Sequence, residues 1–280
     1  MRFCMQIEPL PPPLLHPHIP RRQRRGQERL LSCLLLLAVL AAWYGLVQWR
    51  RLPPLVLPLP TAVARALVQN LLDGFLWPHL WVTLSEIVLG FVGGSVLGVG
   101  LGSLVALAPL VRRILNPYII ASQAMPKLAL APLFVIWCGF GIAPKALIAA
   151  LIAFFPLFEN TLTGLRTVDT ETLDLFRMLG ASRWQVFSKL LLPNAVPYLF
   201  AGLRVAIVLS VVGAVVGEYI GANKGLGALI MASQGMMDTT LMFAVFIVLT
   251  LVGIVLYQLV VYCERLVLTR RARIVPMRAL

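Results

Sequence analysis

Several long apolar stretches determine what this chain can fold into. Residues 30–49, which read LLSCLLLLAVLAAWYGLVQW, and residues 80–107 each reach or exceed the roughly 20 residues that an α-helix needs to cross a bilayer. Charged residues make up 12% of the chain, against roughly 25% in an average soluble domain. Backbone polar groups inside lipid must be satisfied internally, which a helix does within each segment. The predicted fold class is therefore all-α, a polytopic membrane protein.

Six spans are predicted from the apolar runs and the residues that interrupt them. Pro126 and Pro132 are expected to break the third span, and residues 61–77 are expected to lie along the outer surface. The spans are predicted at about residues 30–49, 80–107, 117–139, 144–164, 195–220 and 240–262. The predicted regions are a disordered basic tail (1–29), a first span with its outer segment (30–78), a core membrane domain (79–265) and a second basic tail (266–280).

The basic residues gather on one side of this arrangement. Residues 1–29 contain six arginines, residues 109–116 two, residues 165–193 four basic residues and residues 265–280 five arginines. The opposite loops hold five basic residues, which are Arg50, Arg51, Arg65, Lys145 and Lys224. The positive-inside rule therefore predicts cytoplasmic termini and a cytoplasmic segment 165–193. Topology accounts for the formal charge of +13, and no nucleic-acid partner is expected.

The second predicted span carries glycines at four-residue spacing, at Gly90, Gly94, Gly98 and Gly102. Small residues at this period let another helix approach closely. Packing within the chain is the preferred interpretation, and a dimer interface is the alternative.

The segment DTETLDLFRMLGASRWQVFSKLLLP, residues 169–193, interrupts the apolar runs with a charged helical pattern. Its apolar residues recur at gaps of three and four, which predicts one apolar stripe on a helix. Gly180 predicts a corner between two short helices, and Leu192-Pro193 is expected to end the second. The polar face mixes Asp174 with basic residues, which slightly favours a protein groove over an interfacial helix on lipid.

This segment resembles the cytoplasmic EAA loop of the permease subunits of ATP-binding-cassette (ABC) importers. The loop pattern is Glu-Ala-Ala, three residues, Gly, nine residues and Ile-x-Leu-Pro. Residues 174–176 stand for Glu-Ala-Ala, Gly180 has the required spacing, and residues 190–193 read LLLP. PLFVIWCGFGIAPKALIAALIAFFPLFENTLTGLRTVD and VVGAVVGEYIGANKGLG also resemble the nitrate/sulfonate/taurine group of type I importer permeases. The second stretch is most similar to the branch for thiamine-precursor and other pyrimidine-type solutes.

The resemblance, over roughly residues 80–265, implies two copies of this chain with two ABC ATPase subunits in the bacterial inner membrane, surrounded by lipid. A periplasmic or lipid-anchored binding protein would deliver a small polar or anionic solute. A thiamine pyrimidine precursor or related heterocycle is favoured, and sulfonate, taurine or nitrate come next. The implied ATPase-coupling residues are Glu171, Asp174, Phe176, Arg177, Gly180, Ala181, Ser182, Arg183, Trp184 and Pro193.

No enzymatic motif is found in the chain. Without a Gly-x-x-x-x-Gly-Lys-[Ser/Thr] loop, ATP and Mg are expected to bind only the partner ATPase, and this chain is expected to bind no cofactor. Gly-x-Ser-x-Gly and His-Glu-x-x-His are absent, which argues against an intramembrane hydrolase. The cysteines are scattered, and no metal site is expected. A stand-alone secondary transporter or channel remains the alternative, although the chain shows no convincing internal repeat.

Ionisable side chains inside spans are candidates for a translocation pathway, since each costs about 2.5–3.5 kcal/mol at the bilayer centre. Glu86 and Glu159 are predicted to reach the interface from near the span ends. Lys127 follows Pro126 and either satisfies freed carbonyls or lines the pathway. Arg204 and Glu218 lie about 21 Å apart along one helix and cannot pair. The pathway candidates are Lys127, Asn160, Arg204, Ser210 and Glu218.

Overall fold

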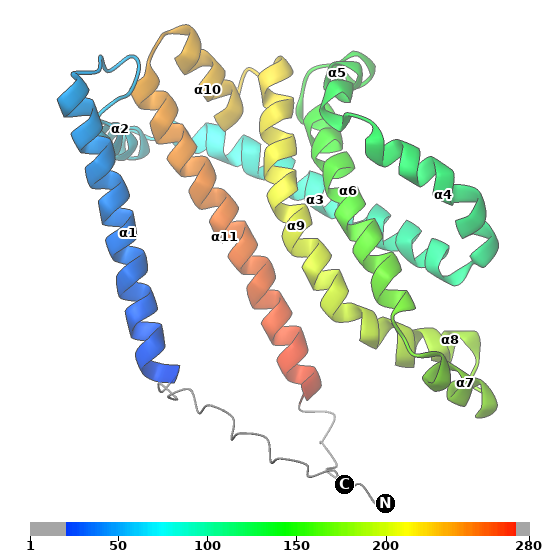
Figure 1. The fold of residues 1–280 in the computed structure, drawn as a ribbon. Coiled ribbons are helices and arrows are strands. Elements are labelled where there is room, and N and C mark those ends of the chain that lie inside the picture. The colour runs from blue at the N-terminus through cyan, green and yellow to red at the C-terminus, as the bar shows by residue number, and fades with distance from the viewer. Residues whose placement is uncertain (1–20, 273–280) are drawn as a thin grey trace, which may run out of the picture. The chain divides into compact units, whose positions relative to one another are not determined.

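The computed structural model describes residues 21–272, and helices connected by short turns make up this range (Figure 1). The chain divides into two compact units between Leu52 and Pro53. The first unit contains α1 (Arg21–Arg50). This helix begins nine residues before the predicted span, so residues 21–29 form its first turns although the sequence assigns them to a disordered tail. The prediction for residues 1–20 lies outside the described residues.

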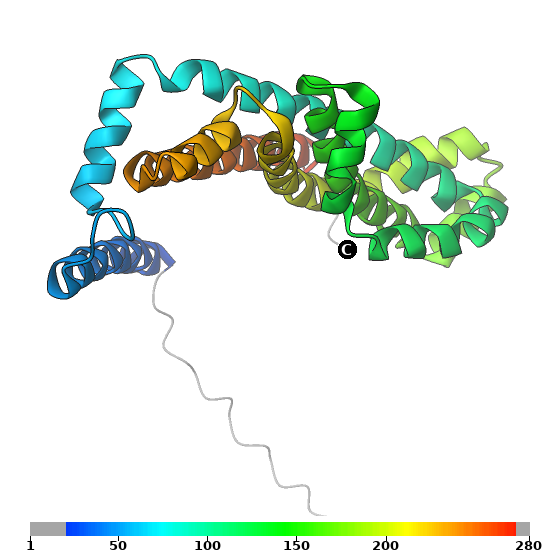
Figure 2. The ribbon, with the colours of Figure 1, turned by 90° about the horizontal axis from the view of Figure 1, so that it is seen from above.

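The second unit is built around three long helices. α3 (Leu76–Leu107), α6 (Ile142–Arg166) and α9 (Leu192–Gly221) pack on one another, and α11 (Thr239–Ala272) packs on α9. Figures 1 and 2 show α6 and α9 side by side with α3 crossing them. α2 (Pro60–Leu72) packs on α11 and α3. Residues 21–272 contain five helices that are long and apolar enough to cross a membrane, or six if one bent pair counts as a span.

The glycine series of α3 is the contact surface for α6. Gly90, Gly94, Gly98 and Gly102 are all buried. A Cβ atom on Gly94 would lie 2.5 Å from the Ala150 carbonyl oxygen, and one on Gly98 would lie 2.8 Å from the Phe154 carbonyl oxygen. The two backbones therefore touch where the side chains are missing. This confirms the interpretation of the glycines as packing within the chain.

The third span differs in part from its prediction. α4 (Pro109–Ala124) begins eight residues before the predicted span, and residues 109–116, which lie between two predicted spans, form its first half because Pro109 starts the helix. The chain bends by 82° at Met125-Pro126 before η1 (Lys127–Leu130) and α5 (Ala131–Cys138). The predicted break at Pro126 is confirmed. The predicted break at Pro132 is wrong, since this proline lies in the first turn of α5, where its missing N–H is harmless.

The predicted stop at Leu192-Pro193 is also wrong. α8 (Arg183–Val186), the π-helical turn η2 (Phe187–Leu191) and α9 form one continuous helix, residues 183–221. Pro193 has no N–H, and its ring would clash with a carbonyl four residues earlier in a regular α-helix. The wider π turn lies just before this proline, which allows the helix to continue through it.

The segment after α9 contains a helix that lies between the last two predicted spans and was not predicted. α10 (Leu226–Gly235) follows Gly225, whose φ of +132° favours glycine. Its Leu226, Leu229 and Ile230 are buried in an apolar cluster with side chains of α3 and α11. α11 then runs to Ala272, beyond the predicted end at 262, so the predicted tail 266–280 begins as helix. The prediction for residues 273–280 lies outside the described residues.

Candidate functional site

The charged segment forms two short helices at the joint end of α6 and α9 (Figure 1). α7 (Thr170–Met178) begins after Asp169 and has Glu171 in its first turn. α8 follows after a corner at Gly180, whose φ is +70°. The structure therefore has the predicted break at Gly180. α10 and α5 lie at the opposite end of these helices.

Two capping motifs fix this corner. The Gly180 N–H donates to the Arg177 carbonyl and the Ala181 N–H to the Phe176 carbonyl, both at 3.0 Å, which is the Schellman pattern that ends a helix with a glycine. Ser182 then begins α8 with a reciprocal capping box, in which its side chain and that of Gln185 each accept a backbone N–H. The capping box begins at the residue that directly follows the Schellman motif. The angle between α7 and α8 is thus set by local hydrogen bonds.

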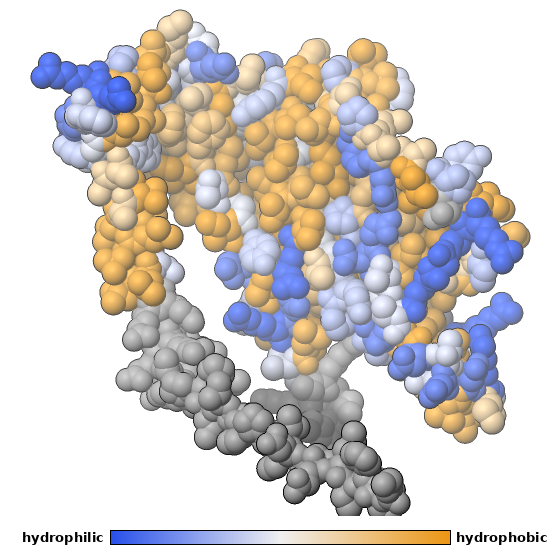
Figure 3. Space-filling view, viewed as in Figure 1, coloured by the Kyte–Doolittle hydropathy of each residue, from blue (hydrophilic) through white to orange (hydrophobic). Residues whose placement is uncertain are grey.

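The predicted apolar stripe divides into two parts. Leu173 and Phe187 pack against a buried cluster of Leu165, Leu191 and Ala195, which anchors the segment on α6 and α9. The side chains around the corner project instead: the exposed fractions are 86% for Met178, 75% for Leu179 and 72% for Trp184. Figure 3 shows hydrophilic and apolar residues interleaved where α7 and α8 project.

Nine of the ten predicted coupling residues lie on α7, α8 and the corner between them, and Pro193 lies in the first turn of α9. Arg177 donates to Asp174 at 3.0 Å, and both side chains are more than 60% exposed, so this pair contributes less than about 1 kcal/mol to stability. Ala181, Phe176 and Pro193 are half-buried. The remaining predicted residues are exposed, namely Glu171, Gly180, Ser182, Arg183 and Trp184. The projection therefore offers charges of both signs around an apolar tip.

The five predicted pathway residues do not form one site. The Lys127 ammonium lies 4.3 Å from the centre of the Phe155 ring and 3.3 Å from the Gln123 carbonyl oxygen. Asn160 donates to the Pro156 carbonyl and Ser210 to the Ala206 carbonyl, each within its own helix. These contacts satisfy local polar groups.

The two charged candidates of α9 have partners on other elements. Arg204 lies 3.5 Å from the Glu264 carboxylate of α11. Glu218 is buried beside α3 and α10. The prediction that Arg204 and Glu218 do not pair agrees with these contacts.

Glu218 belongs to a polar cluster that was not predicted from the sequence. Its Oε1 accepts from the Thr83 hydroxyl at 2.6 Å, and its Oε2 accepts from the Gly227 N–H at 2.5 Å. Thr83 Oγ1 also accepts the Leu226 N–H at 2.7 Å. His79 Nδ1 lies 2.9 Å from the Gly225 carbonyl oxygen. The cluster satisfies the first N–H groups of α10, and a carboxylate at a helix N-terminus is electrostatically favourable.

Glu86 does not reach an interface, contrary to its prediction. It is fully buried, and its Oε1 accepts from Lys145 Nζ at 2.7 Å. Lys145, predicted in an outer loop, lies in the first turn of α6 and is also buried. A buried charge needs a partner, so opposite charges at neighbouring span ends are the signal that identifies such a pair.

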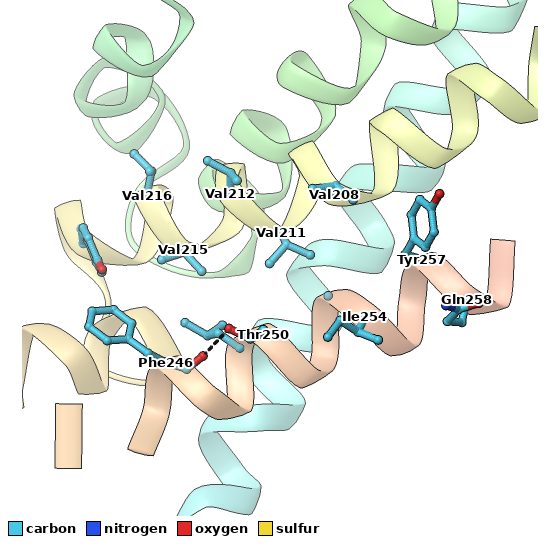
Figure 4. A pocket seen from close by; sticks show the side chains of 13 residues that line it. Val208, Val211, Val212, Val215, Val216, Phe246, Thr250, Ile254, Tyr257 and Gln258 are labelled. Carbon is cyan, nitrogen blue, oxygen red and sulfur yellow. Dashed lines mark hydrogen bonds between the residues drawn. The ribbon is translucent and has the colours of Figure 1, made fainter. Parts of the chain in front are cut away.

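An apolar pocket of about 630 Å³ lies between α9 and α11 (Figure 4). Its walls include Val208, Val212, Phe246 and Ile254, with Thr250 among the few polar side chains. The Thr250 hydroxyl donates a hydrogen bond to the Phe246 carbonyl at 2.8 Å. None of the lining side chains is charged.

Comparisons with known proteins identify similar sequences over most of the chain. Residues 94–269 match the family model "Binding-protein-dependent transport system inner membrane component". The riboflavin transport system permease protein RibX of Chloroflexus aurantiacus is 36% identical over 92% of this chain and 96% of its own length. The formylaminopyrimidine transport permease protein ThiX of Halalkalibacterium halodurans is 33% identical over 89% of this chain and 99% of its own. The taurine transport system permease protein TauC of Escherichia coli is 32% identical over 81% and 84%.

A solved structure shares the fold. A chain of the MetNI methionine ABC transporter, crystallised in an inward-facing conformation, superposes with a TM-score of 0.60 at 19% identity and covers 70% of this chain and 98% of that one. This likeness concerns the helical architecture alone.

Proposed function

This chain belongs to the family of binding-protein-dependent transport system inner membrane components and is a permease subunit of an ABC importer, and on that basis we propose that two copies of it pass a small heterocyclic solute, driven by two ATPase subunits that dock on α7 and α8. It is a multi-span protein of the bacterial inner membrane. The ATPase activity belongs to a separate subunit, where ATP and Mg bind.

The observation that carries the docking proposal is the exposed apolar tip at the Gly180 corner. Met178, Leu179 and Trp184 are exposed around a turn that two capping motifs hold in place. Apolar and aromatic side chains at the centre of a polar rim are typical of a protein interface. A helix lying on anionic lipid would carry a uniformly basic polar face, whereas this projection also exposes Glu171 and Asp174.

The heterocyclic solute is supported by two relatives and by one feature of the structure. The names of RibX and ThiX specify riboflavin and formylaminopyrimidine. The pocket along α9 is apolar and uncharged, which suits a planar ring better than a sulfonate group. Taurine, specified by the name of TauC, is the second candidate.

Purification tests the assembly. When the chain is produced together with its cognate ATPase in mild detergent, we expect the two to co-purify, and we expect the chain alone to hydrolyse no ATP. In proteoliposomes with the cognate binding protein, ATP should drive uptake of labelled formylaminopyrimidine or riboflavin and not of taurine. Transport or ATP hydrolysis by the chain without a second protein would refute the proposal.

The proposed topology places α7 and α8 in the cytoplasm and Lys224 outside. Both Lys224 and Ser182 are exposed positions. In a background without the four native cysteines, a Lys224→Cys variant should react with an impermeant thiol reagent in intact spheroplasts, and a Ser182→Cys variant should react only after lysis. The reverse pattern would invert the topology.

A further inference from the structure

Three ionisable side chains are buried together where α3, α6 and α9 meet. The exposed fractions of Glu86, Lys145 and Glu218 are 0%, 5% and 1%. Each comes from a different one of these helices. The three side chains are buried among packed helices, so water compensates their charge less than it does at a surface.

The formal charges of these three groups do not balance. Two carboxylates against one ammonium leave one negative charge. The Lys145 ammonium lies 2.7 Å from Glu86 Oε1. The nearby titratable groups are His79, whose Nδ1 faces the Gly225 backbone, and Tyr219, which follows Glu218 in the chain. An uncompensated buried charge is strongly unfavourable, and the cluster therefore requires one more positive charge.

The hydrogen bonds show where this charge is needed. Both oxygens of Glu218 accept hydrogen bonds, from Thr83 and from Gly227. Glu86 Oε1 accepts from Lys145, but its Oε2 is buried and receives no hydrogen bond from any described residue. Thr83, which donates to Glu218, lies one helical turn before Glu86 on the same face of α3, so the two carboxyl groups are neighbours. Two acceptors thus meet, and a contact of this kind is favourable only when one of them carries a proton.

We propose that Glu86 and Glu218 bind one proton between them, so that the Glu86–Lys145–Glu218 cluster is neutral and joins α3, α6 and α9. The proton belongs to the pair rather than to either residue, because adjacent carboxylates cannot both ionise. A metal cation fits the cluster less well. The Lys145 ammonium already occupies Glu86 Oε1 and the Gly227 N–H already occupies Glu218 Oε2, and a hard cation requires about six oxygen ligands.

The shared proton has a structural consequence for α10. Glu218 accepts from the Gly227 N–H, and Thr83 links Glu218 to the Leu226 N–H. The same carboxyl group therefore holds the first turn of α10 and contacts Glu86 of α3. The proton-bound pair is a positioning element that fixes α10 against α3 and α9.

Infrared spectroscopy of the purified full-length chain tests the proposal. At neutral pH the wild type should show the C=O band of a protonated carboxylic acid, with a shift in D₂O. Glu86→Gln and Glu218→Gln should each remove this band, because the remaining carboxylate then pairs with Lys145. Lys145→Met should raise the band about twofold, since neutrality then requires protons on both carboxyl groups. Glu159→Gln is the matched control and should leave it unchanged, because Glu159 accepts from Gln123 at a part-exposed position.

Absence of the band in the wild type, or its survival in both glutamine variants, would overturn the proposal. A missing band together with a thermal midpoint that rises with Na⁺ would assign the site to a metal cation and overturn it as well. Size-exclusion profiles show which variants fold. If neither glutamine variant does, ¹³C-labelled glutamate in the wild type decides, because a glutamic acid band must then shift.

Discussion

Gly180→Val is expected to abolish solute uptake while the spans stay inserted. The φ of Gly180 is +70°. This left-handed backbone conformation is strongly unfavourable for a β-branched residue. The Gly180 N–H belongs to the Schellman motif of α7, which directly precedes the capping box of α8. Valine would therefore replace the fixed corner with another backbone conformation, at a cost of at least about 1–2 kcal/mol, and would redirect the apolar tip.

Asparagine provides the matched control at the same position. No atom lies within 4 Å of a Cβ atom built on Gly180, so backbone conformation alone distinguishes the substitutions. Asparagine tolerates the left-handed region and also ends helices in this way, so Gly180→Asn should keep most of the uptake. The assay combines uptake with ATPase co-purification. Normal uptake and normal ATPase binding by Gly180→Val would show that the segment is only an interfacial helix.

The second large effect is expected from Gly94→Leu in α3. A Cβ atom at Gly94 would lie 2.5 Å from the Ala150 carbonyl oxygen and 3.0 Å from the Ala153 Cβ atom. These atoms belong to the backbone and first side-chain atom of α6, which cannot rotate away. Overpacking in a rigid core costs about 1–3 kcal/mol, and we expect the upper end or more. The midpoint of thermal unfolding should fall by many degrees. It is measured from size-exclusion profiles of the heated protein.

Gly100→Leu is the control in the same helix. No atom lies within 4 Å of a Cβ atom at Gly100, and the position is exposed. Leucine there gains helix propensity of about 1 kcal/mol relative to glycine and should leave the midpoint unchanged or raised. Equal midpoints for the two variants would contradict the assignment of the glycine series to the α3–α6 contact.

Features that depend on local sequence were predicted well. The Gly180 corner follows from one residue type in a helical pattern, and the structure adds only the capping hydrogen bonds. The glycine series similarly predicts close helix packing from its spacing, without indicating the partner α6. The break at Pro126 follows from the residue before a proline, which avoids the helical region.

The predictions that are wrong concern features that depend on tertiary packing. Lys145 and Glu86 are 59 residues apart in the chain, and only the packing of α3 on α6 brings them together. Because each lies near the end of a predicted span, the sequence favoured contact with solvent for both. Pro193 looked like a terminator, but a π turn ahead of it keeps the helix continuous. α10 is short, and its burial against α3 and α11 favours a helix that the glycine-rich sequence does not indicate.

The continuity of residues 183–221 makes this helix a lever arm. Its 39 residues span about 58 Å at 1.5 Å per residue. A tilt of about 5° pivoted at one end would displace the other by about 5 Å, a distance comparable to one helical turn. Trp184 lies at one end and Glu218 at the other. A push at the corner of α7 and α8 therefore has a direct mechanical route to the position of α10, and the π turn at residues 187–191 and Pro197 within α9 are places along that route where bending would absorb it.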